Sequence, residues 1–320
     1  MVLEIADNDV AGVIDYEAEM RRVEQVALRR YSDNSRRGHK VALLSYFAYC
    51  KARGKTALPS GGQQIAGYMI ALAGEGKTIG TITTYKNSIL TAHRNMGFEV
   101  ADTKVVRDVL SGLRRTLKAR PKQAKAFGAT HLAAVVATAR IPRKGQGGRL
   151  EKPAAANKRG LFDIAFVSVM MDGLLRVNEA AALTWADVTR PDDNGESMIF
   201  IERSKTDKVG DGVWLPLGAE ASKALWAWYK VSDKQGRVFN LSVDGLMLRV
   251  KAICRAAGFD DEFSSHSFRV GMSVELSKAG FDLAGLMSAG RWKTPSVVAR
   301  YTEQTRDNGG AVRSYHRRLG

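Results

Sequence analysis

Strand-like alternation of apolar and polar residues is confined to one part of this chain of 320 residues, and helical spacing dominates the rest. The alternating segments are Trp185–Val188, Met198–Arg203 and Val213–Pro216, with turn residues between them. Short strands joined by turns predict a small antiparallel sheet. One such sheet among many helices excludes an alternating βαβ enzyme, so we expect a mainly α fold.

Helical periodicity organises the first half of the chain. We predict helices over Ser32–Arg53, Gln63–Ala73, Thr81–Asn95 and Thr103–Lys118, which Gly, Pro and Asp turn residues separate. The stretch Pro59-Ser60-Gly61-Gly62, for example, ends the first of these helices. Helices of this kind with basic ends predict a small helical bundle.

A basic connector, Arg120–Lys125, follows the bundle, and we place a domain boundary just after it. The expected organisation is a flexible acidic tail over residues 1–20, a helical domain over residues 21–127 and a second domain over residues 128–320. The length of the chain is comfortable for two domains, each with its own core.

The second domain begins with a helical segment, Thr130–Ala139, and continues with the strongly apolar helix Leu161–Leu175. The Gly-, Pro- and Arg-rich stretch Pro142–Pro153 between them is an alternative domain boundary. The helical segment that precedes this stretch favours a loop inside the second domain instead.

Charge is distributed unevenly along the chain. The 49 Lys and Arg residues exceed the 33 Asp and Glu residues, which gives a net charge of +16. Residues 1–20 hold six acids and no base, whereas residues 21–128 hold 21 bases and 6 acids. A surplus of this size usually serves to bind a polyanion such as a nucleic-acid backbone. We therefore expect the first domain to bind nucleic acid, although a merely basic protein would have the same composition.

Several classes of protein are excluded by the sequence. No apolar run approaches the ~20 residues that cross a bilayer, and Cys50 and Cys254 suggest neither a disulfide framework nor a zinc site. Gly76-Lys77-Thr78 resembles the end of a phosphate-binding P-loop, but Ala71 stands where that motif needs its first glycine. The acidic run Asp192–Glu196 does not follow the calcium-loop pattern. We expect no metal, no cofactor and no membrane partner.

The residues with chemistry to offer lie in the second domain. They are Arg176, Glu179, Lys205, His266, Arg269, Trp292 and Tyr301. Taken singly, each is more often a packing or helix-surface residue than a catalytic one. Phosphoryl transfer needs positive donors around the non-bridging oxygens, a proton donor for the leaving oxygen and a nucleophile. The set supplies all three, so it predicts phosphoryl-transfer chemistry.

This set resembles the signature of the tyrosine site-specific recombinases, the phage integrase family: Arg, Lys, His-x-x-Arg, His or Trp, and Tyr in that order. Here the pattern is Arg176, Lys205, His266-Ser267-Phe268-Arg269, Trp292 and Tyr301. The resemblance extends over nearly the whole chain. It implies a helical core-binding domain followed by an α-rich catalytic domain with a small antiparallel sheet.

The resemblance also implies a mechanism. Tyr301 would attack the scissile phosphate and form a 3′-phosphotyrosine with release of a 5′-hydroxyl, so that no ATP is needed. Arg176 and Arg269 would hold the non-bridging oxygens. Lys205 would protonate the leaving oxygen, and His266 would assist proton transfer.

Two further roles follow from the same resemblance. Trp292 would donate an indole N–H and pack beside the phosphate, and Glu179 would orient its neighbours. A second round of strand exchange through a Holliday junction would complete recombination. The implied partners are double-stranded DNA with an inverted-repeat site and a homotetramer on two duplexes, a dimer on each, without accessory proteins.

The resemblance assigns DNA contacts to two helices of the first domain and to one arginine of the second. The expected contact residues are Ser35, Arg36, Arg37, Lys40, Thr83, Thr84, Lys86, Arg94 and Arg249. The first eight would approach the major groove and its phosphates, and Arg249 would read a base edge.

The C-terminal residues 311–319 can form a short helix after the breaker Asp307-Asn308-Gly309-Gly310. A frayed basic terminus is the alternative reading of these residues. In the family this helix docks on a neighbouring protomer, which links the subunits in a closed cycle.

Two other functions remain open at this stage. A type IB topoisomerase shares the Arg, Lys and Tyr chemistry but reseals the same strand. A DNA-binding regulator would bind DNA without catalysis and would lose nothing when Tyr301 is replaced by Phe. In each case we expect the protein where DNA is found, in the cytoplasm of a bacterial or phage-infected cell.

Overall fold

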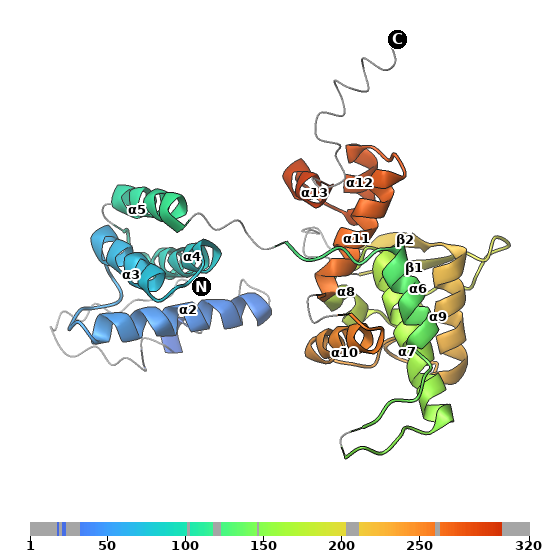
Figure 1. The fold of residues 1–320 in the computed structure, drawn as a ribbon. Helices are drawn as coiled ribbons and strands as arrows, with labels where there is room; N and C mark the ends of the chain where they lie inside the picture. Colours follow the sequence, from blue (N-terminus) through green and yellow to red (C-terminus); the bar gives the residue numbers. More distant parts are fainter. Residues whose placement is uncertain are drawn as a thin grey trace, which may run out of the picture. The chain divides into compact units, whose positions relative to one another are not determined.

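The computed structural model describes residues 18, 21–23, 33–100, 103–117, 123–145, 147–202, 211–259 and 263–302. The chain forms two compact units, Met1–Lys122 and Gln123–Gly320 (Figure 1). The sequence pattern predicts this division after residue 127. Phe127 instead belongs to the core of the second unit, where its backbone N–H donates to the carbonyl oxygen of Ser267 at 3.0 Å.

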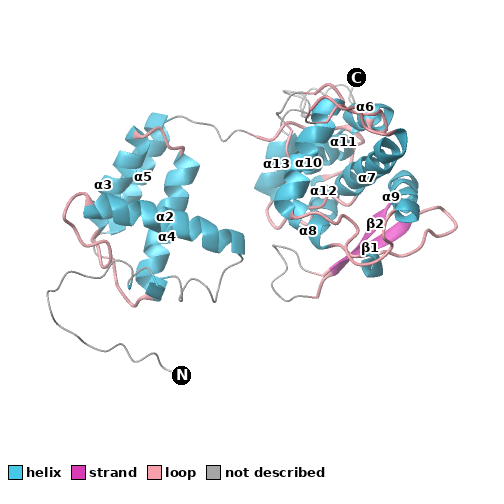
Figure 2. Cartoon of the chain, turned by 90° about the horizontal axis from the view of Figure 1, so that it is seen from below, coloured by secondary structure: helices cyan, strands magenta, loops and turns pink. Residues whose placement is uncertain are grey.

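The first unit is a helical bundle. Its described helices include α2 (Asp33–Lys51), α3 (Gly62–Gly74), α4 (Ile79–Asn95) and α5 (Thr103–Leu117). Helix α4 begins at Thr78, whose side chain accepts a hydrogen bond from the N–H of Thr81 at 3.2 Å. Helices α2 and α4 cross each other (Figure 2), and His39 Nδ1 lies 2.8 Å from Ser88 Oγ at the crossing. The core includes Tyr46, Tyr68 and Met69.

The second unit is built around α7, which spans Pro153–Asp172 and is buried along most of its last three turns. Helix α9 (Ala219–Val231), helix α11 (Ser265–Lys278) and helix α6 (Ala129–Thr138) pack against it. The remaining described helices of this unit are α8 (Val177–Ala182), α10 (Val243–Ala256), α12 (Leu283–Gly290) and α13 (Pro295–Thr302).

Strands β1 (Ser197–Ile201) and β2 (Val213–Leu217) form a two-stranded antiparallel sheet, with Ser197 opposite Leu217 and Ile201 opposite Val213. The prediction of a strand at Trp185–Val188 is wrong, because Trp185–Asp187 is a turn of 3₁₀ helix. Local hydrogen bonds close this 3₁₀ turn. Asp187 Oδ2 accepts one hydrogen bond from the backbone N–H of Thr184 at 2.9 Å and one from its hydroxyl at 2.6 Å. Val188 is not part of a strand but forms an isolated antiparallel β-bridge with Ile199.

The mainly α fold with a small antiparallel sheet is confirmed. No helix in the described part of the chain is long and apolar enough to span a bilayer.

Candidate active site

Five of the six predicted catalytic residues lie in the described part of the second unit, and the fold brings them together. Arg176 precedes α8, His266 and Arg269 lie on α11, Trp292 follows α12, and Tyr301 is on α13. Helices α11, α12 and α13 pack against one another. The sixth, Lys205, lies outside the described residues, between the end of β1 and the start of β2.

The hydroxyl oxygen of Tyr301 lies 2.6 Å from His266 Nε2. Tyr301 is 8% exposed, whereas His266 belongs to the exposed residues of α11. Burial raises the pKa of Tyr301, although the neighbouring charge of Arg269 opposes the rise. Loss of hydration lowers the pKa of His266, and the charges of Arg269 and Arg176 lower it further. Near neutral pH this pair is therefore a protonated phenol beside a neutral imidazole that can accept its proton.

Arg269 is almost completely enclosed, with 1% of its surface exposed. Its Nη1 donates to the carbonyl oxygen of Leu174, and its Nη2 donates to that of Gly290 at 2.7 Å. Its guanidinium carbon lies 4.7 Å from the centroid of the Trp292 ring. Burial, together with repulsion from nearby arginines, lowers the pKa of Arg269 to about 10. Arg269 is therefore held rigidly and stays charged at neutral pH.

Arg176 is the N-cap residue of α8 and pairs with Glu179. Its backbone N–H donates to Glu179 Oε2 at 2.9 Å, and its Nη1 donates to Oε1 at 2.8 Å. Glu179 is buried, whereas the Arg176 side chain keeps 23% of its surface exposed. Glu179 thus orients Arg176 and leaves part of the guanidinium open to a ligand.

Trp292 completes the group. Its ring centroid lies 5.7 Å from that of Tyr301. A Cβ atom at Gly290 would overlap the Trp292 ring, so the close approach of this ring requires glycine there.

The residues expected to contact DNA from the first unit lie on the surface of α2 and α4. The exposed ones are Ser35, Arg37, Lys40, Thr84 and Arg94, and the partly exposed ones are Arg36, Thr83 and Lys86. The pKa of Lys86 is lowered by burial, and the charges of Arg114 and Arg94 lower it further. Cationic side chains of α4 and α5 therefore lie close enough together to affect one another's charge.

Arg249, on α10, is ion-paired with a residue of α7. Its Nε donates to Oδ1 of the fully buried Asp163 at 2.6 Å. Arg143 and Arg159 also approach Asp163 Oδ2, each at 3.5 Å. The side chain expected to read a base is thus held against α7 by a carboxylate on that helix.

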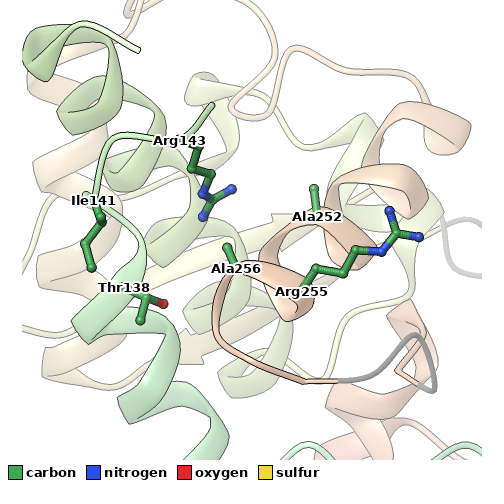
Figure 3. A pocket seen from close by; sticks show the side chains of 6 residues that line it. All are labelled: Thr138, Ile141, Arg143, Ala252, Arg255 and Ala256. Carbon is green, nitrogen blue, oxygen red and sulfur yellow. The ribbon is translucent and has the colours of Figure 1, made fainter. Parts of the chain in front are cut away.

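Two hollows flank this cluster. One, of about 440 Å³, lies between the end of α6, the loop after it and α10, and Arg143 reaches toward it from the loop (Figure 3). The other shares Arg143. Its charged lining residues are Arg143, Lys144, Arg149, Glu151, Lys152, Arg159 and Arg249, which we term the basic surface.

Two residues with a possible functional role are not predicted from the sequence. Arg291 approaches Glu179 Oε2 with Nη2 at 2.9 Å, and Asp163 organises the arginines of the basic surface. An acid within the apolar helix α7 was a visible signal for Asp163, but no motif pointed to Arg291. Within the described residues, no group of three or more His, Cys, Asp and Glu side chains could hold a metal ion.

Comparison with known proteins gives consistent results. Residues 149–307 match the phage integrase family. The recombinase Cre of Escherichia phage P1 is 24% identical over 84% of this chain and 83% of its own length. An integrase/recombinase XerD homolog of Selenomonas ruminantium is also 24% identical, over 85% of this chain and 82% of its own length.

Solved structures share the fold. XerH recombinase in a post-cleavage complex with its palindromic difH substrate has a TM-score of 0.65 at 16% identity, and covers 92% of this chain and 84% of its own. The integrase of transposon Tn1549, in complex with transposon right-end DNA, has a TM-score of 0.63 at 14% identity, over 93% of this chain and 99% of its own.

Proposed function

Because the chain belongs to the tyrosine recombinases of the phage integrase family, we propose that it is a site-specific DNA recombinase whose nucleophile is Tyr301. The observation that carries the proposal is the hydrogen bond of 2.6 Å between the Tyr301 hydroxyl and His266 Nε2, beside two arginines. A nucleophile next to its base and next to positive charge is the arrangement that phosphoryl transfer requires.

Attack begins with the proton of Tyr301. The raised pKa of this phenol means that it is protonated at neutral pH, so it needs a base to become a strong nucleophile. His266, whose pKa is lowered, is neutral and accepts that proton on Nε2. The phenolate oxygen then forms a bond to phosphorus.

The scissile phosphodiester carries one negative charge, and attack by a phenolate adds a second. Arg269 and Arg176 donate to the non-bridging oxygens, where this charge develops. The two bonds that Arg269 makes to carbonyl oxygens fix it before the substrate arrives, so little reorganisation is needed. The Trp292 indole packs beside the phosphate and donates its N–H.

Cleavage ends when the bond between phosphorus and the 5′ oxygen breaks. Lys205 gives a proton to that oxygen, so the products are a 3′-phosphotyrosine and a free 5′-hydroxyl. The phosphodiester energy is conserved in the new link, so no ATP is needed. The cationic side chains take the charge-stabilising role that a metal ion has in other phosphoryl transfers. Attack by the 5′-hydroxyl of a partner strand reverses the same steps.

The substrate is double-stranded DNA. Cationic side chains on α2, α4 and the basic surface provide phosphate contacts. The XerH structure contains its palindromic difH substrate, and the Tn1549 integrase structure contains transposon right-end DNA. We propose an inverted-repeat site bound by a dimer, two of which form a homotetramer with a Holliday-junction intermediate, without accessory proteins. The protein acts on the DNA of the bacterial nucleoid or of a phage-infected cell.

The test begins with finding a site. The Tyr301→Phe protein, which keeps the DNA-contacting residues, is used to select bound fragments from the genome that encodes it; the recovered sequence is termed the selected duplex. Wild-type protein is then incubated with two selected duplexes of different length. DNA products whose lengths show that the arms of the two duplexes have been exchanged would support the proposal.

The other two functions are outcomes of the same test. Relaxation of a supercoiled plasmid that carries the selected duplex, without exchanged products, would indicate a topoisomerase. Binding without any covalent adduct would indicate a regulator.

A further inference from the structure

Arg291 has a backbone conformation that glycine usually provides. It ends α12 with φ 56° and ψ 43°, in the left-handed region. The N–H of Trp292 donates to Met287 O at 2.9 Å, and that of Arg291 donates to Ser288 O at 3.0 Å. This is a Schellman turn, whose left-handed position is most often glycine. An arginine there costs roughly 1 kcal/mol of backbone strain, so the turn itself does not favour arginine at this position.

The side chain of Arg291 is buried at a cost as well. It is 11% exposed, and its Nε and Nη1 have no hydrogen-bond partner among the described residues. Burial of a guanidinium with unpaired donors opposes folding. Both the turn conformation and the burial of this side chain destabilise the folded protein. Stability therefore does not explain why this position is arginine.

One nitrogen of Arg291 joins two parts of the active site. Its Nη2 lies 2.9 Å from Glu179 Oε2, 3.1 Å from Leu174 O and 3.4 Å from Gly173 O. The two carbonyls follow the C-terminus of α7, where the helix dipole is negative and attracts a cation. Leu174 O also accepts from Arg269. Arg291 thus links α12 to Glu179 and to the carbonyl that holds Arg269.

Glu179 is shared between two arginines. Its Oε1 accepts from Arg176 Nη1, whereas its Oε2 accepts from the backbone N–H of Arg176 and from Arg291 Nη2. The guanidinium of Arg176 therefore donates to the carboxylate through one nitrogen, Nη1. Without Arg291, Glu179 Oε2 would be free to accept a second hydrogen bond from the guanidinium of Arg176. Both carboxylate oxygens would then pair with Arg176, which is the two-point geometry that guanidinium and carboxylate prefer.

We infer that Arg291 is a positioning residue for the phosphate site: by occupying Glu179 Oε2 it keeps Arg176 in a one-point pair and leaves the remaining N–H groups of Arg176 for the scissile phosphate. The inference rests on the proposed function. Arg176, Arg269 and Arg291 outnumber the one carboxylate among them, Glu179, so this group keeps a positive surplus for the reacting phosphate.

Glycine is the natural replacement, because it suits the left-handed turn. We expect Arg291→Gly to unfold at the temperature of the wild type or within about 3 °C of it, and to bind the selected duplex within about threefold of it. Formation of the Tyr301 adduct on a selected duplex with a nick near the scissile phosphate should slow by about 10- to 100-fold, as for other residues that orient catalytic groups. Arg291→Lys, which keeps one cationic donor, should recover part of the rate.

A second substitution separates positioning from a structural role. When Glu179→Gln is added to Arg291→Gly, the carboxylate charge that competes for Arg176 is removed. The double variant should therefore form the adduct at least about threefold faster than Arg291→Gly alone. A side chain that only supported the fold would give no such rescue.

The outcomes are distinct. Wild-type rates in Arg291→Gly, or a double variant that is as slow as Arg291→Gly, would overturn this inference while wild-type cleavage left the proposed function intact. Failure of the wild-type protein to form any adduct on the selected duplex would overturn the proposed function itself.

Discussion

Replacing Asp163 by Asn, which keeps the side-chain shape and removes the charge, should lower the free energy of unfolding of the second unit by about 2–3 kcal/mol. Removal of one partner of a buried ion pair typically costs about 3–5 kcal/mol. Asp163 is fully buried and lies 2.6 Å from Arg249. The loss is reduced because Arg249 and Arg143 keep 23% and 25% side-chain exposure and can turn to water.

Arg159 loses little in this variant. It keeps its ion pair with Glu151 at 2.7 Å and its bonds to the carbonyl oxygens of Ala139 and Ile141, at 2.7 and 2.8 Å. A unit of this size shifts its unfolding temperature by about 2–4 °C per kcal/mol. We therefore expect the transition of the second unit to fall by roughly 4–12 °C in differential scanning calorimetry.

The matched control is Glu220→Gln on α9, which removes a carboxylate of the same unit from an exposed pair with Lys223 at 3.9 Å. Exposed pairs contribute about 0–1 kcal/mol, so this variant should unfold close to the wild type. Equal unfolding temperatures for Asp163→Asn and Glu220→Gln would refute the view that Asp163 anchors the basic surface.

Three further predictions follow from the same geometry. The rate of adduct formation should fall about tenfold per pH unit below the lowered pKa of His266, because the protonated imidazole cannot accept the proton of Tyr301; a rate that stays constant down to the pH at which the protein unfolds would contradict this role. Gly271→Ala should destabilise the second unit by about 3 kcal/mol in urea unfolding, the upper end of the usual cost of overpacking, because its Cβ would overlap the backbone of Phe127; a loss below about 1 kcal/mol would mean that the Phe127 segment is not firmly packed. Adduct formation should continue at the full rate in EDTA without ATP, because cationic side chains supply the positive charge at the phosphate; dependence of the rate on added Mg²⁺ would contradict this.

Much of the fold could be predicted because local signals set it. Periodicity and turn residues placed α2 and α4 to within two residues of their ends. The segment after Thr184 was misjudged as a strand, because its alternation of residues matched a strand while the Asp187 side chain closes a 3₁₀ turn. The two hydrogen bonds that one side chain accepts therefore decide the local structure against the pattern.

Only part of the candidate active site could be predicted from the sequence. The order of Arg176, His266 and Tyr301 is a linear motif, so it is visible in the chain. The contact of Arg291 with Glu179 spans 112 positions, and that of Arg249 with Asp163 spans 86. Contacts of this range depend on how α7, α8, α10 and α12 pack, and no local pattern encodes them.

The most direct test of the central claim is the identity of the residue that becomes linked to DNA. Wild-type protein is incubated with the nicked selected duplex, denatured and digested, and the peptides are analysed by mass spectrometry. The account predicts a nucleotide on Tyr301 that is absent from the Tyr301→Phe protein. A nucleotide on another residue, or none on a duplex that the protein binds, would contradict it.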